Sequence, residues 1–303
     1  MTPFPTSLPF SPFDAFAAAL NPVQFALRQQ MNGLDQMIYG HQGLSPTELR
    51  QLAKAGGRGG GIWVVAPGEG LAYFEDLPEF RAAPGRAVTR FSVAGGGGSD
   101  LGAVALARRL ADHYGEPVAG IVAGYSARDA LGDVMGGVAG LNAANLGLHI
   151  HHLARRELEA IEPNPAQVAQ TPRAEAREHA SLRAASGTLV ELLQEPDRTI
   201  ASVAGHSKGA LAISFALDAL MLSGDMATLK RVCRIDLLSI GVLLTVPPVI
   251  QNLTQVMGEY DAFGGVNSDL SNPHHMVSGA GHHLNTDLPC ALDLAAFLRD
   301  QQI

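Results

Sequence analysis

The sequence predicts an α/β fold with a mostly parallel central sheet that is covered by helices on both faces. Short apolar runs rich in β-branched residues alternate along the chain with longer segments that carry apolar residues at helical spacing. The 303 residues are 47% hydrophobic and 17% charged, which is enough apolar material for a large core. The 34 glycines indicate many tight turns between these elements.

Residues 1–45 are expected to form an N-terminal arm with an amphipathic helix. Phenylalanines and prolines crowd its start, and apolar residues then recur at the spacing of one helical face, at Val23, Leu27, Leu34 and Ile38. We expect this arm to pack on the main domain. The alternative is contact of residues 1–40 with a lipid or polymer surface.

The main domain is expected over residues 46–303, and its first half alternates strands with glycine-rich turns. A short helix follows Ser45-Pro46, and strands are predicted at residues 62–65, 71–74, 87–93 and 117–123. The third of these strands runs into Gly95–Gly98, before a helix over residues 101–113.

The second half begins with a change of composition. Residues 127–170 are rich in Ala, Gly and Leu and read as a helical cap insertion. Thr171-Pro172 then starts a long helix that Pro196 ends. Further strands are predicted at residues 199–204, 234–239, 253–258 and 276–278, with helices at 210–222 and 288–298.

Charge and composition exclude several classes of partner. The formal charge of −8, without any basic run, argues against nucleic acid. Glycine, proline or charged residues interrupt the most apolar windows, so we expect no transmembrane segment. Residues 1–22 lack a positively charged start, which favours a cytoplasmic location over a signal peptide. Cys233 and Cys290 are expected to be free thiols, with one disulfide as the alternative.

The candidate nucleophile is Ser207, in the sequence Gly205-His206-Ser207-Lys208-Gly209. A Gly-x-Ser-x-Gly match alone is weak, because a chain with this much glycine contains roughly 0.2 copies by chance. Its context is more specific, since an apolar strand precedes the motif and an Ala-rich helix follows it. A sharp strand-to-helix turn at that point holds a serine hydroxyl at the carboxyl edge of the sheet.

A serine hydroxyl needs a base, and the base needs a carboxylate that fixes its tautomer. Asp261 immediately follows a predicted strand, and His282 lies in a glycine-rich loop after the last strand. Both therefore belong to loops that reach the carboxyl edge of the sheet. The chain order Ser207, Asp261, His282 is the order expected for such a turn.

Three segments resemble motifs of the α/β-hydrolase superfamily, and within it the lipases and esterases. They are Gly205-His206-Ser207-Lys208-Gly209-Ala210, Gly258-Glu259-Tyr260-Asp261 and Gly279-Ala280-Gly281-His282. The resemblance covers roughly residues 62–298 and implies the α/β-hydrolase fold. It also implies Ser207 as nucleophile, His282 as general base and then acid, and Asp261 as the orienting carboxylate. Lys208 departs from the family, where many lipases have Leu or Met.

Negative charge develops on the carbonyl oxygen during acyl transfer, and backbone N–H groups stabilise it best where no Cβ blocks their approach. We expect the N–H of Lys208 as one donor and an N–H from Gly95–Gly98 as the other, with Gly96 as the nominal choice. The alternative for this glycine run is a plain turn or linker. The family's usual His-Gly at this place is absent.

Several residues compete for these roles. His283 is the alternative base, whereas His206 is excluded because neighbours at a sharp turn point apart. Ser126 also follows a strand, but Arg128 replaces the second glycine. The weaker acid candidates are Asp236, Asp269 and Asp287. Two histidine groups lack metal-ligand spacing, so no metal is expected at His149, His151 and His152 or at His274 and His275.

The expected activity is hydrolysis of a carboxylic ester through an acyl-enzyme, with no cofactor. The apolar residues 130–148 favour a lipid-like or polyester substrate, either a small molecule or a polymer. Two alternatives stay open: an acyltransferase or thioesterase that uses the same three residues, and a non-catalytic module that binds lipid or polymer surfaces.

Overall fold

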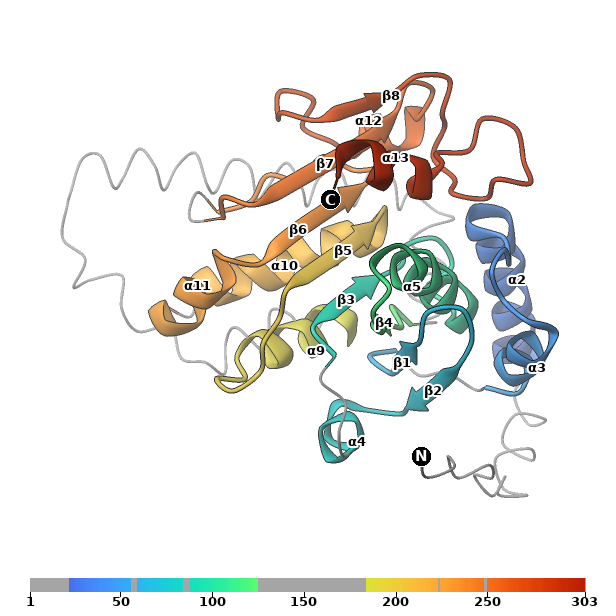
Figure 1. Cartoon of the computed structure of the whole chain (residues 1–303), viewed down its shortest axis with the longest axis horizontal. Helices are drawn as coiled ribbons and strands as arrows, with labels where there is room; N and C mark the ends of the chain where they lie inside the picture. Colours follow the sequence, from blue (N-terminus) through green and yellow to red (C-terminus); the bar gives the residue numbers. More distant parts are fainter. Residues whose placement is uncertain are drawn as a thin grey trace.

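The computed structural model describes residues 22–55, 59–83, 88–124, 184–222, 224–247 and 250–302. These residues form an α/β fold around a twisted sheet of eight strands in the order β2-β1-β4-β3-β5-β6-β7-β8 (Figure 1). The strands are β1 (Ile62–Val65), β2 (Leu71–Phe74), β3 (Arg90–Val93), β4 (Val118–Ile121), β5 (Ser202–His206), β6 (Asp236–Ile240), β7 (Leu253–Gly258) and β8 (His275–Val277).

The sheet is mixed but mostly parallel, as the sequence predicts. The six strands from β4 to β8 in the sheet order pair parallel to their neighbours. β1 alone runs against the strands on both sides of it, pairing antiparallel with β2 and β4. The carboxyl ends of β3, β5, β6 and β7 therefore meet at one edge, where the loops that follow them are brought together.

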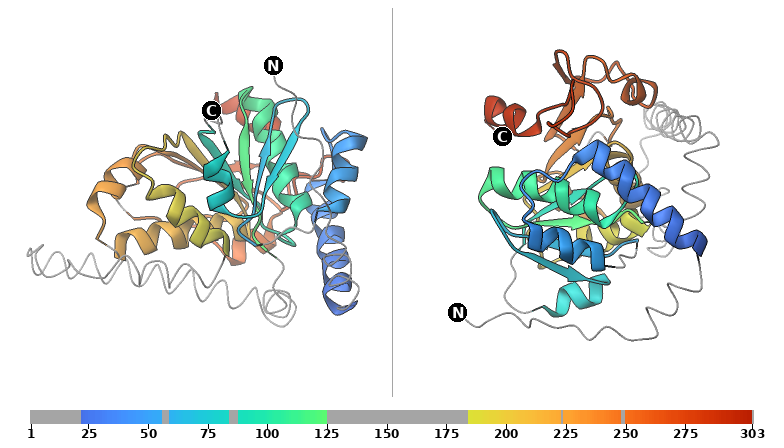
Figure 2. Two further views of the ribbon diagram at one scale, coloured as in Figure 1. Left: turned by 90° about the horizontal axis from the view of Figure 1, so that it is seen from below. Right: turned by 90° about the vertical axis from the view of Figure 1, so that its right-hand side faces the viewer.

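Helices cover both faces of this sheet (Figure 2). One face carries α5 (Asp100–Tyr114), against which α2 (Pro22–Tyr39) and α13 (Leu294–Gln301) pack, with α3 (Pro46–Lys54) beside them. The other face carries α9 (Ala184–Leu193), α10 (Lys208–Leu222), α11 (Met226–Val232) and α4 (Leu77–Ala82). The doubly covered sheet is thus confirmed for the described residues.

Side chains that alternate along each strand divide between two buried cores. Ile62 and Val64 of β1 join the core beneath α9 and α10, whereas Trp63 and Val65 join the core beneath α5. This alternation follows from the two-residue period of a strand whose faces are both covered.

Most predicted elements have the expected position. The strands at residues 62–65, 71–74 and 253–258 have the predicted bounds, whereas β3 starts at Arg90 and the last helix starts at Leu294. The sequence did not predict α4, α11 or α12 (Ala262–Val266), because each is too short for an apolar period. An aspartate caps the start of each, at Asp76, Asp225 and Asp261.

Three predicted segments lie wholly or partly outside the described residues. They are residues 1–21 of the arm, the cap insertion predicted at residues 127–170, and residues 171–183 of the long helix that was expected to start at Thr171. Within the described part, no helix has the length and apolar character needed to cross a membrane. Cys233 and Cys290 are both free thiols, so the alternative of a disulfide is wrong.

Candidate active site

Ser207 occupies the turn between β5 and α10 with a left-handed backbone, at φ 55°. This conformation costs a residue with a Cβ atom about 1–2 kcal/mol. The Ser207 N–H donates to the carbonyl of Ile240, at 2.8 Å, which ties the turn to the end of the neighbouring strand β6. The surrounding sheet therefore holds the serine in a conformation it would not adopt alone.

The two glycines of the motif make this turn possible. A Cβ atom on Gly205 would lie 2.5 Å from the Cα atom of Ala210, and one on Gly209 would lie 2.0 Å from the carbonyl oxygen of Val93. Both distances are far below van der Waals contact, so a side chain at either position would push α10 away from the sheet. The spacing of the motif thus has a steric cause.

Ser207, His282 and Asp261 form one continuous hydrogen-bonded chain. The Ser207 hydroxyl lies 2.8 Å from His282 Nε2, and His282 Nδ1 lies 2.9 and 2.8 Å from the two carboxylate oxygens of Asp261. Because a carboxylate only accepts, Nδ1 carries a proton, and Nε2 is the ring nitrogen that faces the serine hydroxyl. The structure therefore brings together the three residues selected from the sequence.

Asp261 is fixed by the start of α12. Its carboxylate accepts from the N–H of Gly264, at 2.6 Å, and caps that helix. The residue is 4% exposed, so the charge faces His282 with little solvent between them. A Cβ atom on Gly264 would lie 2.1 Å from the carbonyl oxygen of Gly241, and the missing side chain lets the Asp261 turn close against the strand edge.

The competing residues have other partners. His283 Nε2 lies 2.9 Å from the carbonyl of Pro289, and the histidine bonded to Ser207 is His282. Asp269 binds the hydroxyl of Ser271, and Asp236 stands at the amino end of β6, away from the carboxyl edge. Ser126 and the histidines at 149, 151 and 152 lie outside the described residues.

The loop between β3 and α5, Gly95–Gly98, lies directly against the serine turn. A Cβ atom on Gly95 would be 2.7 Å from Ser207 Cβ and 2.8 Å from the backbone nitrogen of Lys208. The N–H groups of Gly95 and Gly97 donate to Tyr39 and Asp35, each at 2.7 Å, and that of Gly98 donates to the Gly95 carbonyl. Within the described part of the chain, the Gly96 N–H is the loop's remaining donor.

Three buried polar residues lie at this site without a role in the sequence analysis: Asp35 and Tyr39, which it did not consider, and His206, which it excluded as the base. Each is fully buried. The predicted apolar stripe of the N-terminal helix is wrong at Leu34, which is 42% exposed, while its neighbour Asp35 faces the protein. The signal in the sequence is a polar residue on the inner face of α2. A search for apolar residues at helical spacing does not detect such a residue.

His206 links the loops of the serine and the base. Its Nε2 atom lies 2.9 Å from the carbonyl of His282, and a carbonyl only accepts, so Nε2 carries a proton. Burial, and secondarily the neighbouring His282, holds the pKa of His206 well below its usual value, so the ring is neutral. Nδ1 therefore accepts from the Tyr39 hydroxyl, at 2.8 Å, and the Tyr39 oxygen accepts from the Gly95 N–H.

Asp35 has an unusual electrostatic environment. Burial raises its pKa to about 6, although hydrogen bonds from Ser99 and Gly97 and the positive charge of Lys208 act in the opposite direction. Lys208, the residue that departs from the lipase pattern, is thus one of the groups that favour the ionised form of this buried carboxyl, and its effect is the smallest of those that lower the pKa.

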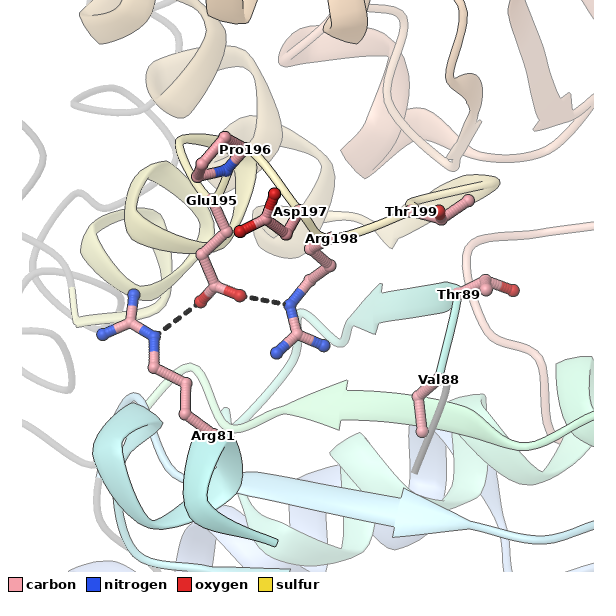
Figure 3. A pocket seen from close by; sticks show the side chains of 8 residues that line it. All are labelled: Arg81, Val88, Thr89, Glu195, Pro196, Asp197, Arg198 and Thr199. Atoms are coloured by element: carbon pink, nitrogen blue, oxygen red, sulfur yellow. Dashed lines mark hydrogen bonds and ion pairs between the residues drawn. The ribbon is translucent and has the colours of Figure 1, made fainter. Parts of the chain in front are cut away.

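The described residues contain no group of three or more His, Cys, Asp or Glu side chains that could hold a metal ion. A hollow of about 520 Å³ lies near the amino ends of β3 and β5, where Glu195 is held between Arg81 and Arg198 (Figure 3). This is the edge of the sheet opposite Ser207, and none of the three hydrogen-bonded residues lines it.

No protein-family model, curated protein or solved structure matches this chain.

Proposed function

We propose that this protein is a serine hydrolase of the α/β-hydrolase type that cleaves carboxylic esters. The observation that carries the proposal is the chain from the Ser207 hydroxyl through His282 to the buried Asp261, with both links within 2.9 Å. The left-handed serine between a strand and a helix, and the order of the three residues along the chain, support the α/β-hydrolase type.

In the proposed reaction, Ser207 Oγ attacks the ester carbonyl while His282 Nε2 takes the hydroxyl proton. The imidazolium that forms is stabilised by Asp261 and then gives this proton to the departing alcohol, which leaves an acyl-serine. A water molecule next attacks the acyl group, again losing a proton to His282. Collapse of that intermediate releases the acid and returns the proton to Ser207 Oγ.

We assign the oxyanion donors to the backbone N–H groups of Lys208 and Gly96. The first follows the nucleophile at the start of α10, and the second lies in the loop after β3, the two places from which such enzymes draw these donors. Gly96 is selected because hydrogen bonds within the fold occupy the other three N–H groups of its loop.

An apolar substrate, either lipid-like or a polyester, is consistent with the apolar side chains that are solvent-exposed near His282. Phe263 lies with its ring 4.9 Å from the ring of His282 and is 43% exposed, and Val266 on the same helix is 52% exposed. Apolar groups beside the reacting atoms favour esters with hydrocarbon chains over charged metabolites. The predicted acyl wall at residues 130–148 lies outside the described residues.

A fluorophosphonate probe tests the proposal, because it bonds covalently to activated serines. We expect the wild-type protein to be labelled and to hydrolyse a p-nitrophenyl ester, and both activities to be lost in Ser207→Ala and His282→Ala. His283→Ala is the matched control and should keep both activities, because its ring is bonded away from the serine. A folded wild-type protein that is not labelled would overturn the proposal.

A further inference from the structure

We propose that two residues of α2, Asp35 and Tyr39, are positioning residues that hold the Gly95–Gly98 loop in its oxyanion-binding shape. This inference rests on the proposed function. It extends that function to a helix that is distant from the motif residues in the sequence but contacts their loops in the fold. Neither residue touches the reacting atoms. Each acts through the loop N–H groups to which it is bonded.

The contacts account for every second N–H group along the loop. Tyr39 Oη accepts from Gly95 at 2.7 Å, and the two oxygens of Asp35 accept from Gly97 at 2.7 Å and from Ser99 at 2.8 Å. An alternating pattern of this kind leaves the Gly96 N–H between two fixed neighbours. Its direction is therefore set by side chains of α2.

The glycines of the loop fit against α2 as well as against the serine. A Cβ atom on Gly96 would lie 2.4 Å from Asp35 Oδ1, and one on Gly97 would lie 2.5 Å from the carbonyl oxygen of Met31. A Cβ atom on Gly102, in α5, would lie 2.7 Å from Asp35 Oδ2. The glycine run thus lets the helix come close enough for Asp35 to reach the loop.

The same helix is joined to the loop of the base. Tyr39 donates to His206, whose Nε2 donates to the carbonyl of His282, and the Leu284 N–H donates to the carbonyl of Ile38 at 2.7 Å. Hydrogen bonds therefore connect both the Gly95–Gly98 loop and the loop that contains His282 to the C-terminal end of α2. A shift of that end would move both parts of the site.

Burial gives these hydrogen bonds their importance. Asp35, Tyr39 and Gly95 are all buried, so a donor that loses its partner there has no water to replace it. Asp35→Asn keeps the size of the side chain but points an amide N–H₂ at one of two backbone donors. Tyr39→Phe keeps the ring and removes the acceptor of Gly95.

The test compares Asp35→Asn and Tyr39→Phe with the wild-type protein in steady-state ester hydrolysis, with active sites counted by fluorophosphonate titration. We expect kcat per titrated site to fall at least about tenfold with little change in KM. Loss of a whole oxyanion donor costs about 10²–10³ in kcat, which sets the upper range. The second-order rate of phosphonylation should fall in parallel, since it also develops charge on the oxygen.

Gly33→Ala is the matched control on the same helix. Nothing lies within 4 Å of a Cβ atom built there, and the residue is exposed, so kcat should stay at the wild-type value. A purely structural role for α2 predicts fewer titrated sites and a lower melting temperature with unchanged kcat per site. That result would overturn the inference while leaving the serine hydrolase intact. A wild-type protein that does not react at all would instead overturn the proposed function.

Discussion

Replacing Asp35 with asparagine removes a carboxyl group whose pKa burial has raised from 3.8 to about 6. In the unfolded chain this group loses its proton near pH 3.8, whereas in the folded protein it keeps the proton until about pH 6. Between these values the folded state binds more protons, so the free energy of unfolding falls as pH rises. The stability that the raised pKa contributes is fully present below about pH 4 and is lost by pH 7 to 8.

The magnitude follows from the size of the pKa change. About two pKa units, at about 1.4 kcal/mol each, correspond to ~3 kcal/mol of stability lost between the two limits. Asparagine does not titrate, so Asp35→Asn lacks this loss. The variant should therefore gain about 2–3 kcal/mol relative to the wild-type protein between pH 4 and pH 8, whatever its absolute stability.

Urea denaturation followed by circular dichroism, at five pH values from 4 to 8, measures this difference. His206, whose pKa burial lowers, is present in both proteins and cancels in the comparison. A stability difference that stays constant across this range would refute the reasoning about Asp35. So would a variant that becomes relatively less stable as pH rises, because Asp35 would then ionise more easily in the folded state.

Four further substitutions probe the site and the fold. Asp261→Asn should lower kcat for ester hydrolysis by about 10²–10⁴-fold with an unchanged circular dichroism spectrum, because the base loses the carboxylate that fixes its tautomer. Gly209→Ala should lower the melting temperature and the labelling yield together, since its Cβ atom would lie 2.0 Å from a carbonyl oxygen of β3. Arg108→Met leaves a buried glutamate unpaired and should cost about 3–5 kcal/mol in urea denaturation. Arg81→Met removes the more exposed ion pair between Arg81 and Glu195, and it should lower the free energy of unfolding by less than about 1 kcal/mol.

The sequence predicted the features that depend on local pattern. The order of strands and helices around Ser207 follows from alternating apolar runs, and the three hydrogen-bonded residues follow from a motif and its expected chain order. The Gly-x-Gly-His register favours His282 over His283 as the base, and the hydrogen bond between His282 and Ser207 agrees with it.

The support for the oxyanion loop could not be read from the sequence. Asp35 is 62 residues from Gly97 along the chain, and Tyr39 is 56 residues from Gly95. Such contacts depend on how α2 packs against α5, which no periodicity specifies. Asp35 lies on the inner face of α2. From sequence alone a charged residue is assigned to the exposed face of a helix, because its burial is favourable only when hydrogen-bond partners are present.

In the proposed hydrolase, the left-handed backbone of Ser207 sets activity against stability. Glycine adopts φ near 55° without the steric cost that a serine or an alanine meets there. Ser207→Gly is therefore expected to be more stable than both the wild-type protein and Ser207→Ala, although it lacks the nucleophile. In the proposed hydrolase, selection for thermal stability alone would favour loss of the hydroxyl, whereas the proposed activity requires it. The glycine variant is also the form best suited to hold an uncleaved ester for crystallography.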